Sequence, residues 1–333
     1  GRVSLSLTSR QGGARNGIGM LFDLGNGNDL YSSLRMSQGY AHFGVGVLFD
    51  QSGEDTYMSE SNSQGSSQYG IGLLIDAGIG SDTFDSMTRS QGSGYVGGVG
   101  ILYNQHGNDT YQCNDPNARE NEMSLYPAFS SPNEKTLSLC QGTGFGHRND
   151  SKRVFLSGGL GLLRDLTGND NYQASVFSQG SGYWQGTGIL SDGGGNDNYG
   201  ANWYSQGSSA HYGIGLFADS GPEYDLFNVD EPSIHRSMGS GYDFGLGAFI
   251  NEAGNDIYHI GPLSAGASIC NGVGLFVDNK GNDTYNAISD HGSGMGDVSS
   301  ECYHTRSAAL TIGIMLDAEG NDQYRYPPSP FPS

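Results

Sequence analysis

The sequence has few basic residues and no long apolar segment. Of its 333 residues only 15 are Lys or Arg, against 35 Asp or Glu, which gives a formal net charge of −20. Proteins bind nucleic acids through basic surfaces that neutralise phosphates, so DNA and RNA are not expected partners. No run of about 18 apolar residues occurs, and we therefore expect no helix that spans a membrane.

Proline and cysteine are also scarce, with 10 and 4 residues. No C-x-x-C spacing occurs, so a cysteine metal site is not expected. Glycine, by contrast, is abundant, with 56 residues. These glycines show neither the every-third-residue period of collagen nor the scatter of a disordered linker, because they recur at fixed places in a longer unit.

That unit is repeated ten times. From Ser37 the sequence is SQGYAHFGVGVLFDQSGEDTY, and from Ser63 it is SQGSSQYGIGLLIDAGIGSDTF. The common pattern is S-Q-G, four or five residues, G-x-G, three mostly apolar residues and D-x-x-G-N-D-x-Y, and uninterrupted copies are 26 or 27 residues long. The copies end at Tyr31, Tyr57, Phe84, Tyr111, Tyr172, Tyr199, Phe227, Tyr258, Tyr285 and Tyr324. A fixed period of this size indicates a solenoid or another stacked array.

The repeat predicts an all-β, single-domain parallel β-helix (β-solenoid) of about ten coils. Short apolar runs such as VGVLF and IGLLI fit strands bounded by turns, and a 26-residue unit is too short for a propeller blade. Right-handed crossovers are expected. We place the solenoid at 1–325, with insertions at 112–138, 147–156 and 293–308, and a proline-rich tail or linker at 326–333. The first residues already belong to a repeat, so we expect a mature or excised piece of a longer protein.

Several columns of the aligned repeat predict what the coils bury. A large apolar residue stands two positions before the first Asp of every copy, from Leu21 to Met315. The residue between the two glycines, from Ile18 to Ile312, is mostly β-branched and suits a packed pleated surface. The final aromatic predicts an internal ring stack, and a row of tyrosines that grips sugar is the alternative. The Gln column predicts side-chain amides that bond along the stack, with a ligand-binding row as the alternative.

Two acidic rows accompany the turns. The first is Asp23, Asp50, Asp76, Asp165, Asp192, Asp219, Asp278 and Asp317, with Asn104 and Asn251 in its gaps. The second is unbroken and consists of Asp29, Asp55, Asp82, Asp109, Asp170, Asp197, Asp225, Asp256, Asp283 and Asp322. Like charges one coil apart repel, so each row needs backbone N–H donors, as in Asx-turns, or a cation. Calcium suits carboxylates and turn carbonyls, and the second row supplies its expected ligands.

The turn element, written NGND, TGND, GGND, AGND, KGND or EGND, resembles the Gly-rich Asp turn of the RTX calcium-binding β-roll. The resemblance covers about five residues per copy. It departs from the RTX pattern because the element occurs once per 26-residue unit, whereas the RTX nonapeptide occurs twice per coil. The repeats also look like those of bacterial surface β-solenoid proteins. These resemblances imply calcium in the turns and carry no enzymatic activity.

The four cysteines lie beside the interruptions of the repeat. Pairing Cys113 with Cys140 and Cys270 with Cys302 would staple two insertions, and buried free thiols are the alternative. An even number of cysteines in an acidic chain favours secretion or the cell envelope.

Candidate binding residues lie where the repeat is broken, because insertions in repeat proteins form loops that often carry function. The segment HRNDSKRVF brings together His147, Arg148, Lys152 and Arg153 in a chain with few basic residues. They form a candidate site for an acidic glycan, unless they only neutralise nearby carboxylates. On successive coils, Trp184, His211 and Asp243 form either an exposed sugar-binding strip or an unrelated surface row.

Two functions remain after these arguments. The favoured one is an extracellular or cell-envelope structural and binding solenoid, stabilised by calcium, with a glycan or a surface protein as its partner. The alternative is a polysaccharide lyase or glycoside hydrolase that acts on acidic glycans. Regular coils and the absence of a Ser-His-Asp order or a paired non-repeat carboxylate favour the non-enzymatic function.

Overall fold

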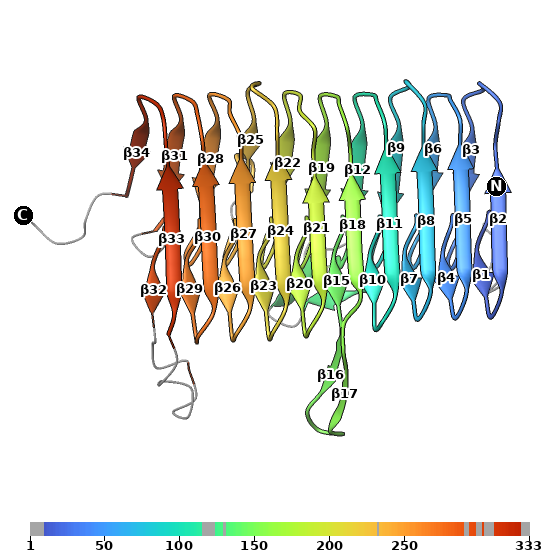
Figure 1. Ribbon diagram of the computed structural model, residues 1–333, viewed down its shortest axis with the longest axis horizontal. Coiled ribbons are helices and arrows are strands. Elements are labelled where there is room, and N and C mark those ends of the chain that lie inside the picture. Colours follow the sequence, from blue (N-terminus) through green and yellow to red (C-terminus); the bar gives the residue numbers. More distant parts are fainter. Residues whose placement is uncertain are drawn as a thin grey trace, which may run out of the picture.

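The computed structural model describes residues 10–114, 124–128, 131–231, 233–289, 293–297, 302 and 310–327. In this part of the chain there is no helix, and three ten-stranded parallel sheets each take one strand from every coil. The predicted parallel β-helix of about ten coils is therefore confirmed (Figure 1). The described residues include no helix that is long and apolar enough to cross a membrane.

The strands of the three sheets follow one another in every coil. The first sheet contains β1 (Ala14–Arg15), β4 (Ala41–His42), β7 (Ser67–Gln68), β10 (Gly94–Tyr95), β15 (Gly144–Phe145), β20 (Gly182–Tyr183), β23 (Ser209–Ala210), β26 (Gly241–Tyr242), β29 (Ser268–Ile269) and β32 (Gly296–Asp297). The second sheet contains β2 (Ile18–Phe22), β5 (Val45–Asp50), β8 (Ile71–Asp76), β11 (Val99–Asn104), β18 (Leu160–Arg164), β21 (Thr187–Ser191), β24 (Ile214–Asp219), β27 (Leu246–Asn251), β30 (Val273–Asp278) and β33 (Ile312–Asp317). The third sheet contains β3 (Leu30–Ser32), β6 (Thr56–Met58), β9 (Thr83–Ser86), β12 (Thr110–Cys113), β19 (Asn171–Ala174), β22 (Asn198–Gly200), β25 (Leu226–Phe227), β28 (Ile257–Ile260), β31 (Thr284–Ala287) and β34 (Gln323–Arg325).

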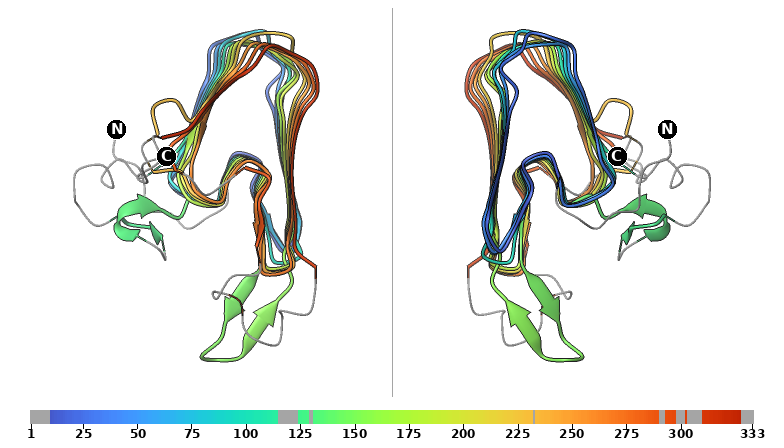
Figure 2. Two further views of the ribbon diagram at one scale, coloured as in Figure 1. Left: turned by 90° about the vertical axis from the view of Figure 1, so that its left-hand side faces the viewer. Right: turned by 90° about the vertical axis from the view of Figure 1, so that its right-hand side faces the viewer.

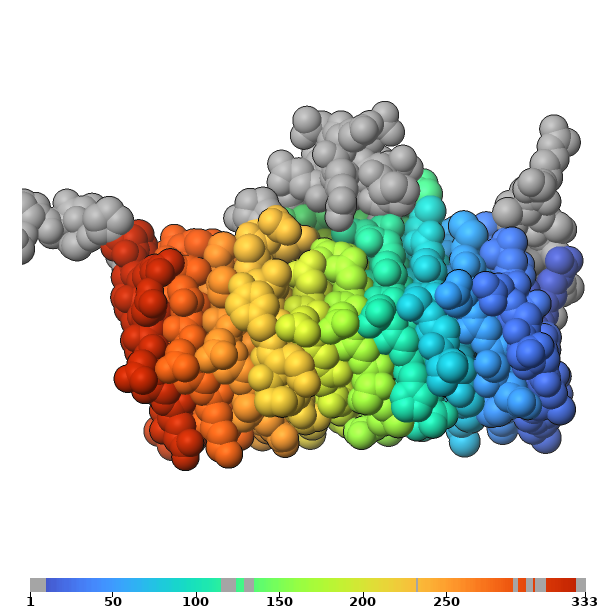
Figure 3. All heavy atoms as spheres, turned by 90° about the horizontal axis from the view of Figure 1, so that it is seen from above, coloured from blue at the N-terminus to red at the C-terminus, as the bar shows by residue number. Residues whose placement is uncertain are grey.

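The coil is right-handed. In Figure 1 the strands of the second sheet run upward at the front, and the chain crosses the top to the third sheet behind. Each coil is displaced to the left of the one before it, which gives a right-handed path. Viewed from above, the coils form successive bands from the N-terminal to the C-terminal end of the rod (Figure 3).

The core contains two of the predicted columns. The final aromatics of the repeat form an internal stack, in which the rings of Tyr57 and Phe84 are 4.7 Å apart and almost parallel. The same stacking continues to Tyr285 and Tyr324, whose rings are 4.9 Å apart. The leucine column is also buried, as at Leu48 and the equivalent positions of the following coils. The internal ring stack is thus confirmed, and these rings are not a surface for sugar.

The column between the two glycines does not face the core, which corrects the sequence-based interpretation. Ile71 and Ile214 are 48% and 46% exposed. Side chains alternate along a strand, and the inward position beside them belongs to the second glycine of the G-x-G pair. A Cβ atom on Gly46 would lie 2.2 Å from the carbonyl oxygen of Tyr40, so only glycine permits this close approach.

The Ser-Gln-Gly segment forms a tight turn in the coils where the structure describes it. Gln38 and Gly39 both have positive φ, 52° and 75°, and Tyr40 N donates to Ser37 O over 3.1 Å, as in a type I′ turn. The glutamine amides do not bond to one another along the stack. Instead, the Nε2 of Gln64 donates to the carbonyls of Tyr57 and Asp85 on consecutive coils, each over 2.9 Å. The glutamine column therefore has a structural role, linking backbone to backbone.

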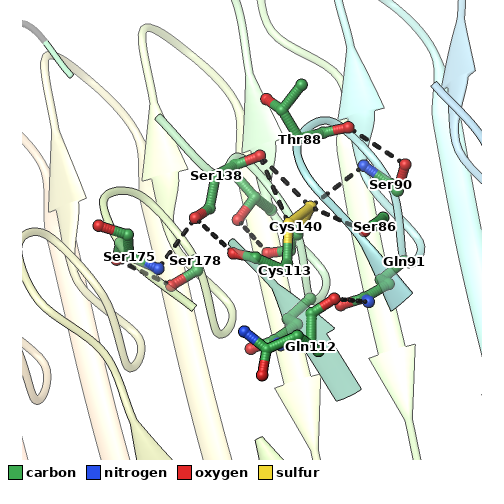
Figure 4. The surroundings of a disulfide bond; sticks show 12 residues. Ser86, Thr88, Ser90, Gln91, Gln112, Cys113, Ser138, Cys140, Ser175 and Ser178 are labelled. Carbon is green, nitrogen blue, oxygen red and sulfur yellow. Dashed lines mark hydrogen bonds between the residues drawn. A yellow bond between two sulfur atoms is a disulfide. The ribbon is translucent and has the colours of Figure 1, made fainter. Parts of the chain in front are cut away.

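Both predicted disulfides are present, between Cys113 and Cys140 and between Cys270 and Cys302. The first joins the end of β12 to the start of the next Ser-Gln-Gly turn, where the Oγ of Ser138 donates to the carbonyl of Cys113 (Figure 4). Two disulfides are typical of proteins from oxidising compartments. β12 extends to Cys113 and β32 pairs with β29, so the repeat continues into the ranges assigned to the first and third insertions.

Each of the first two insertions contains an antiparallel hairpin, formed by β13 (Pro127–Ala128) with β14 (Ser131–Thr136) and by β16 (His147–Asn149) with β17 (Val154–Leu156). Viewed along the rod, the coil bends inward between the third and first sheets, and the hairpins lie on the two sides of that bend (Figure 2). Most of the third insertion, and residues 328–333 of the expected tail, lie outside the described residues.

Candidate functional site

The two acidic rows form a buried column behind the turns that join the second and third sheets. Each first-row Asp ends or directly follows a second-sheet strand, and most of them cap their own turn: the Oδ1 of Asp76 accepts a hydrogen bond from Gly78 N over 2.9 Å. Its Oδ2 accepts a bond from the hydroxyl of Tyr57 in the preceding coil over 2.7 Å. Backbone and tyrosine donors thus satisfy both oxygens of this carboxylate.

In most carboxylates of the second row only one of the two oxygens accepts a hydrogen bond. The Oδ1 of Asp82 accepts a bond from the backbone N of Asp55 in the preceding coil over 2.6 Å, and the same bond recurs along the rod. The Oδ2 atoms of this row are buried, and several have no hydrogen-bond partner among the described residues. These are the Oδ2 atoms of Asp55, Asp82, Asp170, Asp197, Asp225 and Asp283.

Asn104 and Asn251 show what these oxygens lack. The Nδ2 of Asn104 donates to the Oδ2 of Asp109 over 2.8 Å, and the Nδ2 of Asn251 donates to the Oδ2 of Asp256 over 2.7 Å. In both coils an amide hydrogen therefore lies between the two side chains. Where the first-row residue is Asp, a proton or a cation has to take the place of that hydrogen, because two facing carboxylates repel.

Burial and mutual repulsion hold protons on this column. Burial, followed by the charge of Asp76, raises the pKa of Asp82 to about 8. Burial, followed by the charges of Asp165 and Asp192, raises the pKa of Asp170 to about 10. Carboxyls with such pKa values are protonated at neutral pH unless a cation replaces the proton.

Groups of three carboxylates in the column are close enough to hold a metal ion, with one oxygen of each residue within 4.8 Å of the others. Asp55, Asp76 and Asp82 form one such group, and Asp197, Asp219 and Asp225 form another. From the sequence, only the second row was expected to supply metal ligands. The structure adds one first-row carboxylate to each of these two groups, because the rows approach each other across the core.

A separate feature is a groove along the inward bend between the third and first sheets. Two cavities of about 460 and 250 Å³ lie there and share Arg148, Phe177 and Tyr183 in their walls. Aromatic rings cover both sides of the groove: Tyr95 stacks on Phe145 at 4.5 Å, and Phe177 contacts Tyr183 at 5.0 Å. The groove therefore has an aromatic lining several coils long.

Cationic side chains are held on these rings. The guanidinium of Arg236 lies 4.9 Å from the ring centre of Tyr242, that of Arg89 5.8 Å from Tyr95, and the Nζ of Lys135 4.4 Å from Trp203. Arg89 forms no ion pair among the described residues, and its buried Nε has no hydrogen-bond partner there. Burial, followed by the charges of Arg236 and Lys135, lowers the pKa of His235 to about 4.

The predicted basic site is only partly assembled at this groove. His147 and Arg148 lie in its wall, whereas Lys152 and Arg153 are exposed at the turn of the β16–β17 hairpin. The Nε of Arg148 pairs with Asp150 at 2.9 Å, so one of the four cations does neutralise a local carboxylate. Binding of a ligand by these residues stays a prediction.

The row of Trp184, His211 and Asp243 lies on successive coils as predicted, but it is not an exposed strip. Asp243 is 3% exposed and its Oδ2 lies 2.5 Å from the Nδ1 of His211. The Nη1 of Arg148 lies 3.1 Å from the Nε2 of the same histidine, and the guanidinium stacks 4.9 Å from the ring of Trp184. Asp243 is therefore buried, whereas Trp184 and His211 are half-buried against Arg148 of the β16–β17 hairpin.

The aromatic lining was not predicted from the sequence, although the sequence contains a signal for it. Tyr95, Phe145, Tyr183 and Tyr242 occupy the same position of the repeat, three residues after the glycine of the Ser-Gln-Gly position. Phenylalanine or tyrosine occurs at this position only between the fourth and the eighth coil, so the fold does not require such a ring in every coil. No protein family, characterised protein or solved structure matches the chain.

Proposed function

We propose that this protein is a secreted or cell-envelope solenoid that binds an extended acidic glycan in the aromatic groove. The observation that carries the proposal is the set of cations held on aromatic rings, in particular Arg89, Arg148 and Arg236, on a chain of net charge −20. Aromatic faces pack against the apolar faces of sugar rings, and guanidinium groups bind carboxylate or sulfate in a bidentate manner. The two disulfides agree with an oxidising compartment.

A glycan array, followed by titration with the best uronic-acid or sulfated polymer, tests this proposal. Replacing Arg89 and Arg148 by Gln should weaken binding by tenfold or more, and salt should weaken the wild-type interaction. The matched control removes two positive charges at the hairpin turn, through Lys152→Gln with Arg153→Gln, and should bind as the wild type does. A wild-type protein that ignores every acidic polymer, or two variants with equal affinity, would contradict the proposal.

Binding without cleavage is the form of this function that the site supports best. A guanidinium only donates hydrogen bonds, so the Nε2 of His211 accepts the bond from Arg148 and its Nδ1 donates to Asp243. The lone pair that a general base requires is therefore already engaged. Incubating the same polymers with the protein and measuring new reducing ends and unsaturated products distinguishes binding from a lyase or a hydrolase.

We also propose that calcium stabilises the carboxylate column. The orphaned Oδ2 atoms support this second proposal, since carboxylate oxygens are the preferred calcium ligands. Metal analysis after dialysis against calcium should find several ions per chain, and a chelator should lower the melting temperature. Replacing Asp192 by Asn together with Tyr172→Phe copies the Phe84–Asn104 arrangement and should abolish binding at one position, whereas Asn104→Asp should add one. No bound metal and unchanged melting with a chelator would leave protons as the only neutralising charges.

A further inference from the structure

The outer face of the second sheet is apolar over its whole length. Its strands are paired in register, so their outward side chains form three rows. The rows are Ile18, Val45, Ile71, Val99, Leu160, Thr187, Ile214, Leu246, Val273 and Ile312; Met20, Val47, Leu73, Ile101, Leu162, Ile189, Leu216, Ala248, Leu275 and Ile314; and Phe22, Phe49, Ile75, Tyr103, Arg164, Ser191, Ala218, Ile250, Val277 and Leu316. Only Arg164, Thr187 and Ser191 interrupt them.

The third sheet shows that this composition is not a requirement of the fold. Its strands pair in the same parallel manner, yet its outward positions are largely polar, as at Thr83, Thr110, Asn171 and Asn198. Strand propensity can therefore be met here with threonine and asparagine facing water. Single exposed apolar residues are common on protein surfaces, whereas a large continuous apolar face marks a contact with another surface.

The shape and extent of the face suit a second sheet of the same kind. Its ten strands lie side by side with little twist in Figure 1, and neither described hairpin covers the face in Figure 2. Strand spacings of about 4.8 Å and rises of about 3.3 Å per residue give a face of roughly 45 by 16 Å. Two copies packed on it would bury about 1,400 Å² in total, within the usual range for a stable dimer.

Charge also favours a second copy. The chain is acidic, with a formal net charge of −20, so two copies repel each other over most orientations. The three outward rows contain no carboxylate, and their single charge is Arg164, which bonds to Ser191 on the neighbouring strand. This face is therefore the surface on which two rods can approach without juxtaposing acidic groups.

We propose that two copies of the chain pack face to face through the outer surfaces of their second sheets, about a two-fold axis. The three rows of each copy then interdigitate at the sheet separation of about 10 Å that sandwiches adopt. A two-fold contact is closed, so the assembly stops at a dimer. The aromatic grooves lie between the first and third sheets and stay open, so the inference does not depend on the glycan proposal.

Sedimentation velocity over a concentration series tests the proposal. The wild-type chain should sediment as a species with twice the mass of the monomer. The double substitution Ile189→Asp with Leu216→Asp, in the middle row, should raise the dissociation constant of the dimer at least 100-fold. The matched control, Gln112→Asp with Gln173→Asp, adds two charges to the outer face of the third sheet and should stay dimeric. Circular dichroism checks that each variant is folded, and Ile189→Thr with Leu216→Thr replaces the Asp pair if that pair does not fold.

Three outcomes would overturn the proposal. One is a wild-type chain that is monomeric at about 100 μM, far above the dissociation constants of ordinary stable interfaces. Another is a folded Ile189/Leu216 variant that dimerises as strongly as the wild type. The third is a monomeric wild type that binds neutral phosphatidylcholine vesicles and loses this binding in the same variant, which would assign the face to a lipid surface.

Discussion

Phe84 lies at the position of the ring stack where a tyrosine hydroxyl would face the side-chain amide of Asn104. Strand register aligns Phe84 with Tyr57 and Asn104 with Asp76, and in that coil the tyrosine hydroxyl donates to the aspartate. An amide Nδ2 cannot accept such a bond. Phe84 lacks the tyrosine hydroxyl, and Asn104, in the next coil, lacks the carboxylate that would accept its hydrogen bond. The two departures from the repeat therefore compensate each other.

The same pair of departures recurs at Phe227 and Asn251. Register aligns Phe227 with Tyr199 and Asn251 with Asp219, and the hydroxyl of Tyr199 donates to the Oδ2 of Asp219 over 2.7 Å. The pairing of Phe with Asn is thus a property of the column rather than of one coil.

A double-mutant cycle measures this coupling. Phe84→Tyr alone should lower the free energy of unfolding by about 1–3 kcal/mol, because the Nδ2 of Asn104 already donates to Asp109 and to the hydroxyl of Tyr111, which leaves the new buried hydroxyl without a partner. Combined with Asn104→Asp, it recreates the arrangement of the other coils and should cost less than the sum of the two single changes. Denaturant unfolding of the four proteins gives the coupling energy. Strictly additive costs would show that the side chains do not interact.

Removing the hydroxyl of a stacked tyrosine should lower the free energy of unfolding, although the ring itself stays in the stack. Tyr199→Phe leaves the buried Oδ2 of Asp219 without its donor, so we expect a loss of about 1–3 kcal/mol. Tyr199→Ala also removes the ring from the stack and should cost roughly 3–5 kcal/mol. Urea unfolding curves compare the two variants with the wild type. Equal losses would mean that the ring itself contributes little.

Stability in the presence of a chelator should fall as the pH rises. Burial, with neighbouring carboxylates, raises the pKa of Asp197 to about 9 and that of Asp256 to about 8 in the folded chain. Between the ordinary pKa of an Asp, about 3.9, and these values, the unfolded chain has lost protons that the folded chain retains. The stabilisation is therefore complete below about pH 4 and is lost progressively up to about pH 9.

Melting temperatures measured from pH 5 to 9 in EDTA check this direction. Calcium should flatten the decline, because it replaces the protons as they are lost and because its binding releases protons. A melting temperature in EDTA that rises with pH would contradict the protonated column. A decline that calcium leaves unchanged would contradict the cation proposal alone.

Loss of the first disulfide should weaken the rod at the insertions. Cys113→Ser with Cys140→Ser frees the segment that precedes the Ser-Gln-Gly turn and should cost about 2–4 kcal/mol. The corresponding change at Cys270 and Cys302 serves as the comparison. Thermal unfolding with and without a reductant measures both effects, and a wild-type protein that reductant leaves unchanged would show that the bonds contribute no stability.

The sequence by itself determined the coil. Ten copies of one unit, with glycine, leucine, aspartate and an aromatic at fixed offsets, admit few arrangements besides in-register stacking, so the parallel solenoid, the ring stack and both cysteine pairs could be predicted. Each depends on spacing along the chain, which the sequence states directly.

Only the tertiary structure decided which side of each strand faces water and which distant segments meet. The column from Ile18 to Ile312 has the composition of a core but lies outside, because the glycine beside it takes the inward position that the approaching turn requires. The groove exists because the coil bends inward between the third and first sheets. That bend buries Asp243 under His211 and brings Arg148 onto the same histidine, although 63 residues separate them in sequence.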